Sequence, residues 1–222
     1  MIISPIAYIR TEFPEKFGIP RQSGLADNLQ ARIVFEPEYR NPDALRGLEG
    51  FSHIWLIWEF SANRQAKWQP TVRPPRLGGN EHMGVFATRS PYRPNPLGLS
   101  CVKIDSIEND PMDGPVIKVC GADLMDGTPI YDIKPYIRYA DSVPDALCGY
   151  VDNLDERSLQ VIMSEGLSEK LGPVSDALIQ VLRLDPRPSY HDDPSRVYGM
   201  SFSGYNVKFT VAHGVLTVVE ID

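Results

Sequence analysis

The sequence is poor in the residues that build disulfide frameworks and metal sites. Its 222 residues include three cysteines and four histidines. Cys101, Cys120 and Cys148 are odd in number, widely spaced and surrounded by apolar or small residues, which is typical of reduced core cysteines in a cytosolic protein. The histidines show no metal-ligand spacing with one another or with cysteine. We therefore expect no disulfide framework, no metal and a cytoplasmic location.

Signals of several large protein classes are also missing. No G-x-S-x-G, G-x-G-x-x-G or Walker A sequence occurs, and these motifs mark many hydrolases and nucleotide-binding proteins. No charged-then-apolar secretion signal is present. The longest apolar candidate, around residues 54–57, is interrupted by Glu59 and is far too short to span a bilayer. The sequence predicts a soluble protein with no membrane partner.

Negative charge dominates the chain, but one segment reverses the sign. The sequence has 22 Lys and Arg against 29 Asp and Glu, for a net charge of -7. Residues 61–104 nevertheless carry seven positive side chains and only Glu81 as a negative one. A basic segment in an acidic protein predicts one localised anionic partner. Nucleic acid is the obvious candidate because Trp68 lies among the cations and can stack on a base; a solvated basic face is the alternative.

The most distinctive segment is residues 84–100, GVFATRSPYRPNPLGLS. Its three prolines fix φ and push the preceding residues toward extended geometry, so no helix can pass through it. A stiff loop that carries arginine forks is suited to bind a carboxylate or a phosphate. An ordinary surface loop with solvated arginines is the other interpretation. The loop presents Arg89, Tyr92, Arg93 and Asn95.

The pattern before residue 140 predicts a mainly β domain. We expect strands at residues 2–10, 31–35, 52–60, 85–88, 99–107, 116–120 and 129–137, with a short helix at 41–48. Residues 52–60 are nearly continuously apolar, which is typical of a strand buried on both faces. No long helical period occurs between residues 51 and 139. The sequence therefore predicts a β-barrel or sandwich over residues 1–140, and not a doubly wound nucleotide-binding fold.

The remaining residues predict a small α+β domain. Residues 141–155 are acidic and rich in turn formers, so we assign them to a linker. The domain would span residues 156–222, with a helix at 173–184 and antiparallel strands at 197–201, 207–212 and 216–221.

A polar cluster follows the strand expected at 116–120. Asp126-Gly127 is a typical β-hairpin turn. Residues 123–136, DLMDGTPIYDIKPY, also place carboxylates, a lysine and prolines beside that turn, which is unusual for a simple hairpin.

Five motifs together resemble one family. They are PRQ at 20–22, RGLEGFSHIW at 46–55, RPPRLGGN at 73–80, the 84–100 segment and LMDGTPIYDIKPY at 124–136. In this order they resemble the TsaA-like family, known in bacteria as TrmO. The resemblance implies S-adenosylmethionine-dependent methylation at N6 of threonylcarbamoyladenosine beside the tRNA anticodon. It also implies a homodimer and a compact β-barrel that binds the cofactor unlike Rossmann-type methyltransferases.

The resemblance implies a set of cofactor contacts. An arginine fork suits the carboxylate of S-adenosylmethionine, and a carboxylate such as Asp126 suits its ribose diol. The implied contacts are Pro20, Arg21, Gln22, Ser61, Ala62, Arg89, Leu99, Asp123, Leu124, Met125 and Asp126.

The reaction needs further groups, which we assign by their chemistry. Asn95, His53, Asp132 and Tyr92 are candidates to assist loss of the acceptor proton. Arg64, Lys67, Arg73 and Arg76 are expected to bind tRNA phosphates, with help from Arg187 and Tyr190. Arg93 is expected to bind the threonyl carboxylate. An RNA-binding module without turnover and a small-molecule methyltransferase remain alternatives.

Overall fold

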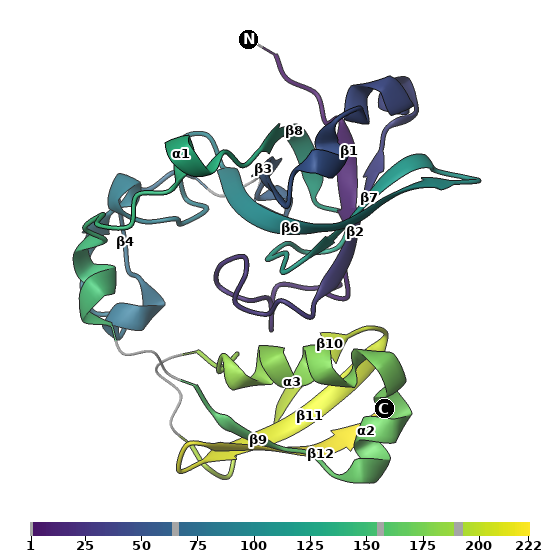
Figure 1. Cartoon of the computed structure of the whole chain (residues 1–222). Coiled ribbons are helices and arrows are strands. Elements are labelled where there is room, and N and C mark those ends of the chain that lie inside the picture. Colours follow the sequence, from purple (N-terminus) through teal and green to yellow (C-terminus); the bar gives the residue numbers. More distant parts are fainter. Residues whose placement is uncertain (1, 64–66, 155–157, 189–192) are drawn as a thin grey trace.

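The chain folds into a β-rich N-terminal domain and a smaller C-terminal domain (Figure 1). The computed structural model describes residues 2–63, 67–154, 158–188 and 193–222. A segment that contains the short helix α1 (Arg138–Asp141) leaves the first domain and runs down one side of the molecule to the second.

The N-terminal domain is a closed, antiparallel barrel. Its strand order is β1-β2-β7-β6-β3-β8, and β1 pairs with β8 to close the sheet. Every pairing within it is antiparallel. The expectation of a mainly β domain is thus confirmed. The strands are β1 (Ala7–Arg10), β2 (Gln30–Phe35), β3 (His53–Glu59), β6 (Leu97–Asp110), β7 (Gly114–Cys120) and β8 (Pro129–Pro135).

Strand β3 differs from its prediction. Ile54, Leu56 and Trp58 face the barrel core, whereas the residues between them are only half-buried. The prediction that both faces are buried was wrong, because Trp55 and Ile57 are apolar residues on the outer face of the barrel. Apolar identity alone does not distinguish the two faces of such a strand.

Two other segments form 3-10 turns where we expected longer elements. The strand expected at 85–88 is a 3-10 helix (Val85–Ala87), in which Thr88 N bonds to the carbonyl of Val85 at 3.2 Å. The helix expected at 41–48 is divided into Pro42–Leu45 and Leu48–Gly50. Gly47 between them has φ 88, a left-handed value that interrupts a helix.

Further short elements complete this part of the chain. A two-stranded ribbon of β4 (Thr71–Val72) and β5 (Met83–Gly84) lies within the basic segment. Additional 3-10 helices are Pro37–Tyr39, Ser61–Asn63, Pro75–Leu77 and Gly149–Asn153. Asp126 and Gly127 form the expected turn, but β7 and β8 are not neighbours, so this turn does not connect a hairpin.

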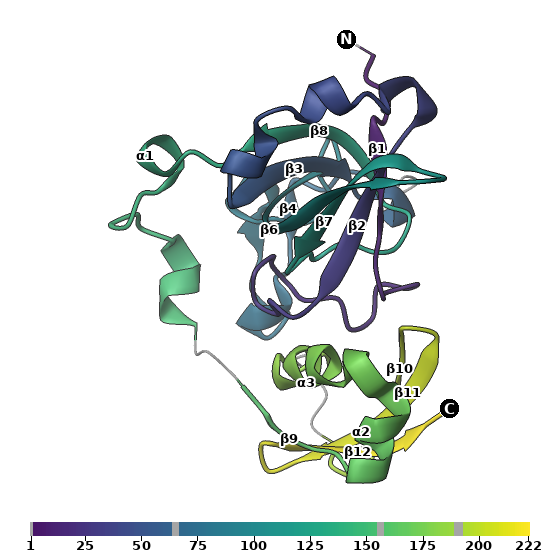
Figure 2. The same cartoon turned by 45° about the vertical axis from the view of Figure 1, so that its right-hand side comes forward.

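The C-terminal domain is a sheet covered by two helices (Figure 2). Its strand order is β10-β11-β12-β9, with β9 parallel to β12. The expected strands and long helix are present, and the sequence analysis missed β9 and α2. The elements are β9 (Gln160–Ile162), α2 (Glu165–Leu171), the 3-10 helix Gly172–Val174, α3 (Ser175–Arg183), β10 (Tyr198–Phe202), β11 (Tyr205–Ala212) and β12 (Val215–Ile221).

The loop between β1 and β2 joins the two domains. Phe13, Ala26 and Leu29 belong to the same apolar cluster as the buried face of α3 and the sheet residues of the C-terminal domain. The Phe13 ring packs edge-on against Phe202 with centroids 5.4 Å apart. The core of the C-terminal domain is therefore completed by residues of the N-terminal domain.

Candidate functional site

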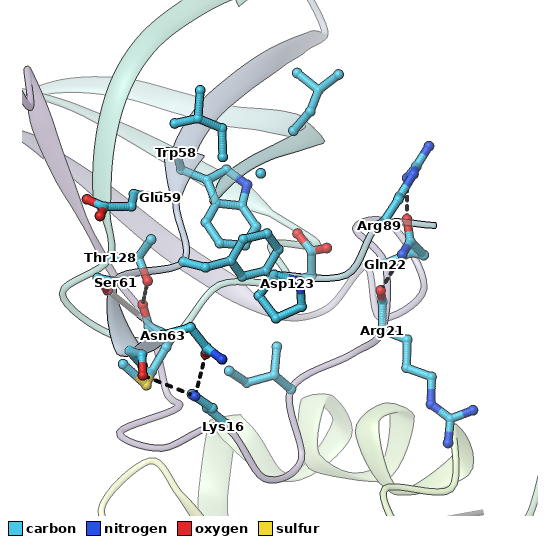
Figure 3. Close-up of a pocket in the computed structure, with 18 of the residues that line it drawn as sticks. Lys16, Arg21, Gln22, Trp58, Glu59, Ser61, Asn63, Arg89, Asp123 and Thr128 are labelled. Atoms are coloured by element: carbon cyan, nitrogen blue, oxygen red, sulfur yellow. Dashed lines mark hydrogen bonds between the residues drawn. The ribbon is translucent and has the colours of Figure 1, made fainter. Parts of the chain in front are cut away.

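A cavity of about 420 Å³ opens where the end of β3 meets the start of β6. Residues from four segments line it: 16–22, 58–63, 88–99 and 123–128. Figure 3 shows the side chains of these segments turned toward a common space. The barrel supplies the rigid strand ends, and the loops supply most of the polar groups.

Trp58 forms an apolar wall of this cavity. Its side chain is almost fully buried, and its indole Nε1 donates to Ser100 Oγ at 2.9 Å. Phe60 packs against the indole edge-on with centroids 4.4 Å apart. Gly98 is the partner of Trp58 in the pairing of β3 with β6, and the absence of a side chain there leaves room for the ring.

Asp123 continues the hydrogen-bond chain that begins at Trp58. Ser100 Oγ donates to Asp123 Oδ1 at 2.6 Å. Burial raises the pKa of this carboxyl above its ordinary value, while the Ser100 hydrogen bond and the positive charge of Arg89 oppose the shift. A carboxylate held this way is a strong acceptor that faces the cavity with little solvent around it.

Arg89 stands at the mouth of the cavity. Its guanidinium donates to Gln22 Oε1, and Gln22 Nε2 donates to the Arg21 carbonyl at 2.5 Å. The Arg21 side chain points away from Asp123, and its Nη2 reaches the carbonyl of Asp185 in the C-terminal domain at 3.5 Å (Figure 3). Of these two arginines, Arg89 is the better placed to hold a carboxylate.

Most of the expected cofactor residues line this one cavity. They are Pro20, Arg21, Gln22, Ser61, Ala62, Arg89, Leu99, Asp123 and Met125. Leu124 and Asp126 do not. The Leu124 side chain is buried in the barrel core. Asp126 accepts from Thr11 N at 3.1 Å and lies 3.6 Å from Arg10. The carboxylates that line the cavity are Asp123 and Glu59, and Glu59 accepts from the Tyr131 hydroxyl at 2.6 Å.

None of the candidates for proton removal lines the cavity. His53 lies at the opposite end of β3, where its Nδ1 is 2.9 Å from Ser52 Oγ. Asp132 pairs with Ile57 on the outer face of the barrel and forms an ion pair with Lys134 at 2.9 Å. Asn95 and Tyr92 are exposed on the proline-rich loop. The geometry brings none of these groups to the space between Trp58 and Asp123.

The basic segment is attached directly to the proline-rich loop. Gln69 N bonds to the Tyr92 carbonyl and Val85 N to the Pro70 carbonyl, both at 3.0 Å. Trp68 is 52% exposed. The predicted phosphate-binding side chains Lys67, Arg73 and Arg76 are exposed on this unit, whereas Arg64 and Tyr190 lie outside the described residues.

Arg93 lines the cavity and also holds its own loop together. Its Nη1 donates to the Thr88 carbonyl at 2.7 Å, with longer contacts of 3.4 Å to the carbonyls of Val85 and Ser90. Its guanidinium carbon lies 5.9 Å from the centre of the Phe86 ring. One guanidinium nitrogen therefore orders the loop in which Arg89 stands.

Arg187 is placed differently from the other predicted tRNA contacts. Its side chain is only 12% exposed, and it binds Asp185 through two nitrogens at 2.8 and 2.9 Å. This pairing raises the pKa of Arg187. A guanidinium engaged in this way has little left to offer a phosphate.

Sequence analysis missed several residues at the site. Trp58, Phe60 and Ser100 were assigned to strands as core positions, and Lys16 was not considered. The relevant signal is the register: a glycine immediately after the proline-rich loop lies opposite a tryptophan in the next strand. Lys16 Nζ donates to the Ala62 carbonyl at 3.3 Å and so connects two walls of the cavity (Figure 3).

Comparison with known families accounts for both domains. The model of the tRNA-methyltransferase O N-terminal domain matches residues 8–142. The model of the TrmO C-terminal domain matches residues 156–222. The chain belongs to the TrmO family. The resemblance seen in the motifs is thereby confirmed.

Individual relatives agree with this assignment. A tRNA (adenine(37)-N6)-methyltransferase of Escherichia coli is 37% identical over 226 residues, covering 98% of this chain and 96% of the relative. A protein with the same description from Eikenella corrodens is 46% identical over 77% of this chain and 97% of its own length. The crystal structure of TrmO from Pseudomonas aeruginosa superimposes with a TM-score of 0.81 at 33% identity, covering 100% of this chain and 98% of that one.

In the parts of the chain that the structure describes, no helix is long and apolar enough to cross a bilayer. Across the same residues, no three His, Cys, Asp or Glu side chains come together as a potential metal site.

Proposed function

We propose that this chain is an S-adenosylmethionine-dependent tRNA methyltransferase that methylates N6 of adenosine 37. The names of its full-length relatives support this activity. The observation that carries the proposal is the cavity, where nine residues assigned to the cofactor from separate parts of the sequence meet around Trp58. The two alternatives, a non-catalytic module and a small-molecule methyltransferase, are not favoured by these relatives.

The residues present fit S-adenosylmethionine. The cavity volume of about 420 Å³ is within the range of small-molecule sites. Arg89 offers a cationic fork for the amino acid carboxylate, and Asp123 offers an acceptor for a hydroxyl or an ammonium group. Trp58 and Phe60 supply aromatic surface for the adenine or the sulfonium. We propose that Arg89 and Asp123 provide the charged contacts to the bound ligand.

The protein contributes mainly alignment to the reaction. When bound, S-adenosylmethionine supplies an electrophilic methyl group. Trp58 near the end of β3 and Asp123 in the loop after β7 form walls of the cavity, between which an acceptor nitrogen can be brought in line with that group. Ser100 and Trp58, which begin the hydrogen-bond chain to Asp123, are buried. We propose no side chain as the base, because none of the candidates His53, Tyr92, Asn95 and Asp132 lines the cavity.

We further propose that the acceptor is the threonylcarbamoyl form of adenosine 37. The N6 proton beside a carbonyl and a purine ring is more acidic than that of an ordinary exocyclic amine, and the nitrogen becomes a good nucleophile for the methyl group once that proton is lost. Arg93 lines the cavity and is our candidate to bind the threonyl carboxylate. The phosphates of the anticodon stem would be bound by the basic side chains Arg64, Lys67, Arg73 and Arg76. A cytoplasmic homodimer is part of the same proposal.

Incubation with labelled S-adenosylmethionine tests this function. The substrates are total tRNA from cells that make the threonylcarbamoyl modification and tRNA from cells that lack it. We expect label only in the first preparation, at adenosine 37. Label in neither preparation would overturn the methyltransferase proposal, and equal label in both would overturn the threonylcarbamoyl requirement alone. An Arg89→Ala variant serves as the control for cofactor-dependent labelling.

A further inference from the structure

The loop between β1 and β2 has two functional faces. Lys16, Ile19 and residues 20–22 line the cavity. Phe13 and Phe17 pack into the apolar core of the C-terminal domain, and Ile19 touches that core as well. Side chains a few residues apart therefore serve the cavity on one side and the second domain on the other.

The barrel domain holds the backbone of this loop near its ends, and Lys16 and Gln22 add side-chain hydrogen bonds to Ala62 and Arg89. Asp126 N bonds to the Phe13 carbonyl at 2.8 Å. At the other end of the loop, Gly24 N donates to the Gly121 carbonyl and Gly121 N donates to the Leu29 carbonyl, both at 2.8 Å. Residues 14–23, which carry the cavity wall, are held between these two anchor points.

The C-terminal domain contacts the middle of the loop at close range. Gly18 has φ 94, and a Cβ atom built on it would lie 2.1 Å from Met200 Sδ. Met200 is fully buried in β10, so its side chain cannot move aside without repacking of the core. Ser201 N also donates to Glu15 Oε1 at 3.2 Å. The approach between loop and strand requires glycine at position 18 on both steric and conformational grounds.

Helix α3 is hydrogen-bonded to the same loop near the start of β2. Asn28 N donates to Gln180 Oε1 at 2.9 Å, and Gln180 Nε2 donates to Asp27 Oδ1 at 2.7 Å. A single side chain of the second domain thus satisfies a backbone donor and a carboxylate of the loop.

The geometry points to the C-terminal domain as the positioning element of the cofactor cavity: by packing against residues 13–29 it holds Pro20, Arg21 and Gln22 in their binding geometry. The inference rests on the proposed cofactor of this cavity. Its consequence is reciprocal, because a ligand that binds the ordered loop must also stabilise the docking of the two domains. No contact between the C-terminal domain and tRNA is needed for this role.

The test compares substitutions at two glycines that both have positive φ. Gly18→Ala introduces a side chain at positive φ and forces Met200 away. Gly214→Ala also introduces a side chain at positive φ (78), in the β11–β12 turn, where no neighbouring atom lies within 4 Å. Gln180→Ala is a further test variant, because it removes the hydrogen bonds to Asn28 N and Asp27 without introducing a steric conflict. Hydrogen exchange of residues 14–23 and the Kd for S-adenosylmethionine, from titration calorimetry, are measured on the full chain.

For Gly18→Ala we expect faster exchange in residues 14–23 and S-adenosylmethionine binding weakened at least tenfold. For Gln180→Ala we expect severalfold weaker S-adenosylmethionine binding. Gly214→Ala should match the wild type in both measurements. Unchanged exchange and Kd in folded Gly18→Ala and Gln180→Ala would overturn the inference. The exchange measurement needs neither cofactor nor tRNA, so it still decides the matter if the wild-type protein fails to methylate tRNA.

Discussion

Gly98 lies directly across from Trp58 in the barrel sheet, and a Cβ atom on Gly98 would lie 2.2 Å from Cε2 of the indole. We predict that Gly98→Ala displaces the indole and breaks its hydrogen bond to Ser100. Overpacking of this kind costs about 1–3 kcal/mol. The free energy of unfolding from urea titration should fall by that amount, and the affinity for S-adenosylmethionine should fall at least tenfold.

Gly50→Ala is the matched control for this substitution. Gly50 has no atom within 4 Å of its would-be Cβ and its φ is not positive. Its stability and ligand affinity should stay close to those of the wild type. Wild-type affinity in Gly98→Ala would show that the indole is not part of the binding surface.

Asp123 provides a prediction about pH. Its pKa is raised in the folded protein, chiefly by burial, so the stability that it contributes is complete below its unfolded pKa and is lost as pH rises through the folded value. Asp123→Asn keeps an acceptor for Ser100 and removes the charge. We expect the variant to gain thermal stability relative to wild type as pH rises from about 4 to 7.

The affinity for S-adenosylmethionine should fall in Asp123→Asn, although the stability of the free protein rises. Loss of a charged acceptor is expected to weaken S-adenosylmethionine binding by at least tenfold, as hydrogen bonds to charged groups contribute about 1.5–3 kcal/mol. If Asp123→Asn is less stable than the wild type at neutral pH, the buried charge of Asp123 does not destabilise the ligand-free protein, and this account of Asp123 is wrong.

Arg89 should matter to the complex and not to the free protein. The side chain is exposed and donates a hydrogen bond to Gln22, so Arg89→Ala should change the unfolding free energy by less than about 1 kcal/mol. A ligand at a hundred times its Kd adds about 2.7 kcal/mol, or roughly 5–10 °C in Tm for a chain of this size. We expect that shift to be largely lost in Arg89→Ala and retained in Arg138→Ala, an exposed arginine outside the cavity. Severe destabilisation of the free variant would instead make Arg89 a structural residue.

Sequence patterns predicted a β-barrel or sandwich because the expected strands are turn-bounded and free of helical period, and only the family resemblance implied a barrel. They predicted most of the cavity through a family resemblance, not through geometry. The choice between Asp123 and Asp126 could not be made from sequence, since it depends on Thr11 and Arg10 occupying the second carboxylate. The dependence of residues 13–29 on the C-terminal domain was equally hidden, because apolar residues in a loop do not reveal which core they join.

Arg73 and Arg76 of the basic segment should control tRNA affinity without affecting the cofactor. Changing Arg73 and Arg76 together to Ala should reduce the log-log salt dependence of tRNA binding by roughly two units if each contacts one phosphate. Filter binding at several salt concentrations measures this slope. The control is the Arg46→Ala/Arg138→Ala double variant, which removes the same charge from exposed positions elsewhere. An unchanged slope in the Arg73/Arg76 variant would place the phosphate contacts outside this segment.

Arg93 combines two roles that one variant can separate. Its Nη1 holds the carbonyls of the proline-rich loop, while the residue also lines the cavity. If the rest of the guanidinium binds the threonyl carboxylate, Arg93→Ala should lower methylation of modified tRNA at least tenfold, with S-adenosylmethionine affinity changed only severalfold. Radiolabel transfer and calorimetry on the same preparation measure the two effects. A parallel loss of both would mean that Arg93 acts only by ordering the loop around Arg89, and the carboxylate would then need another partner.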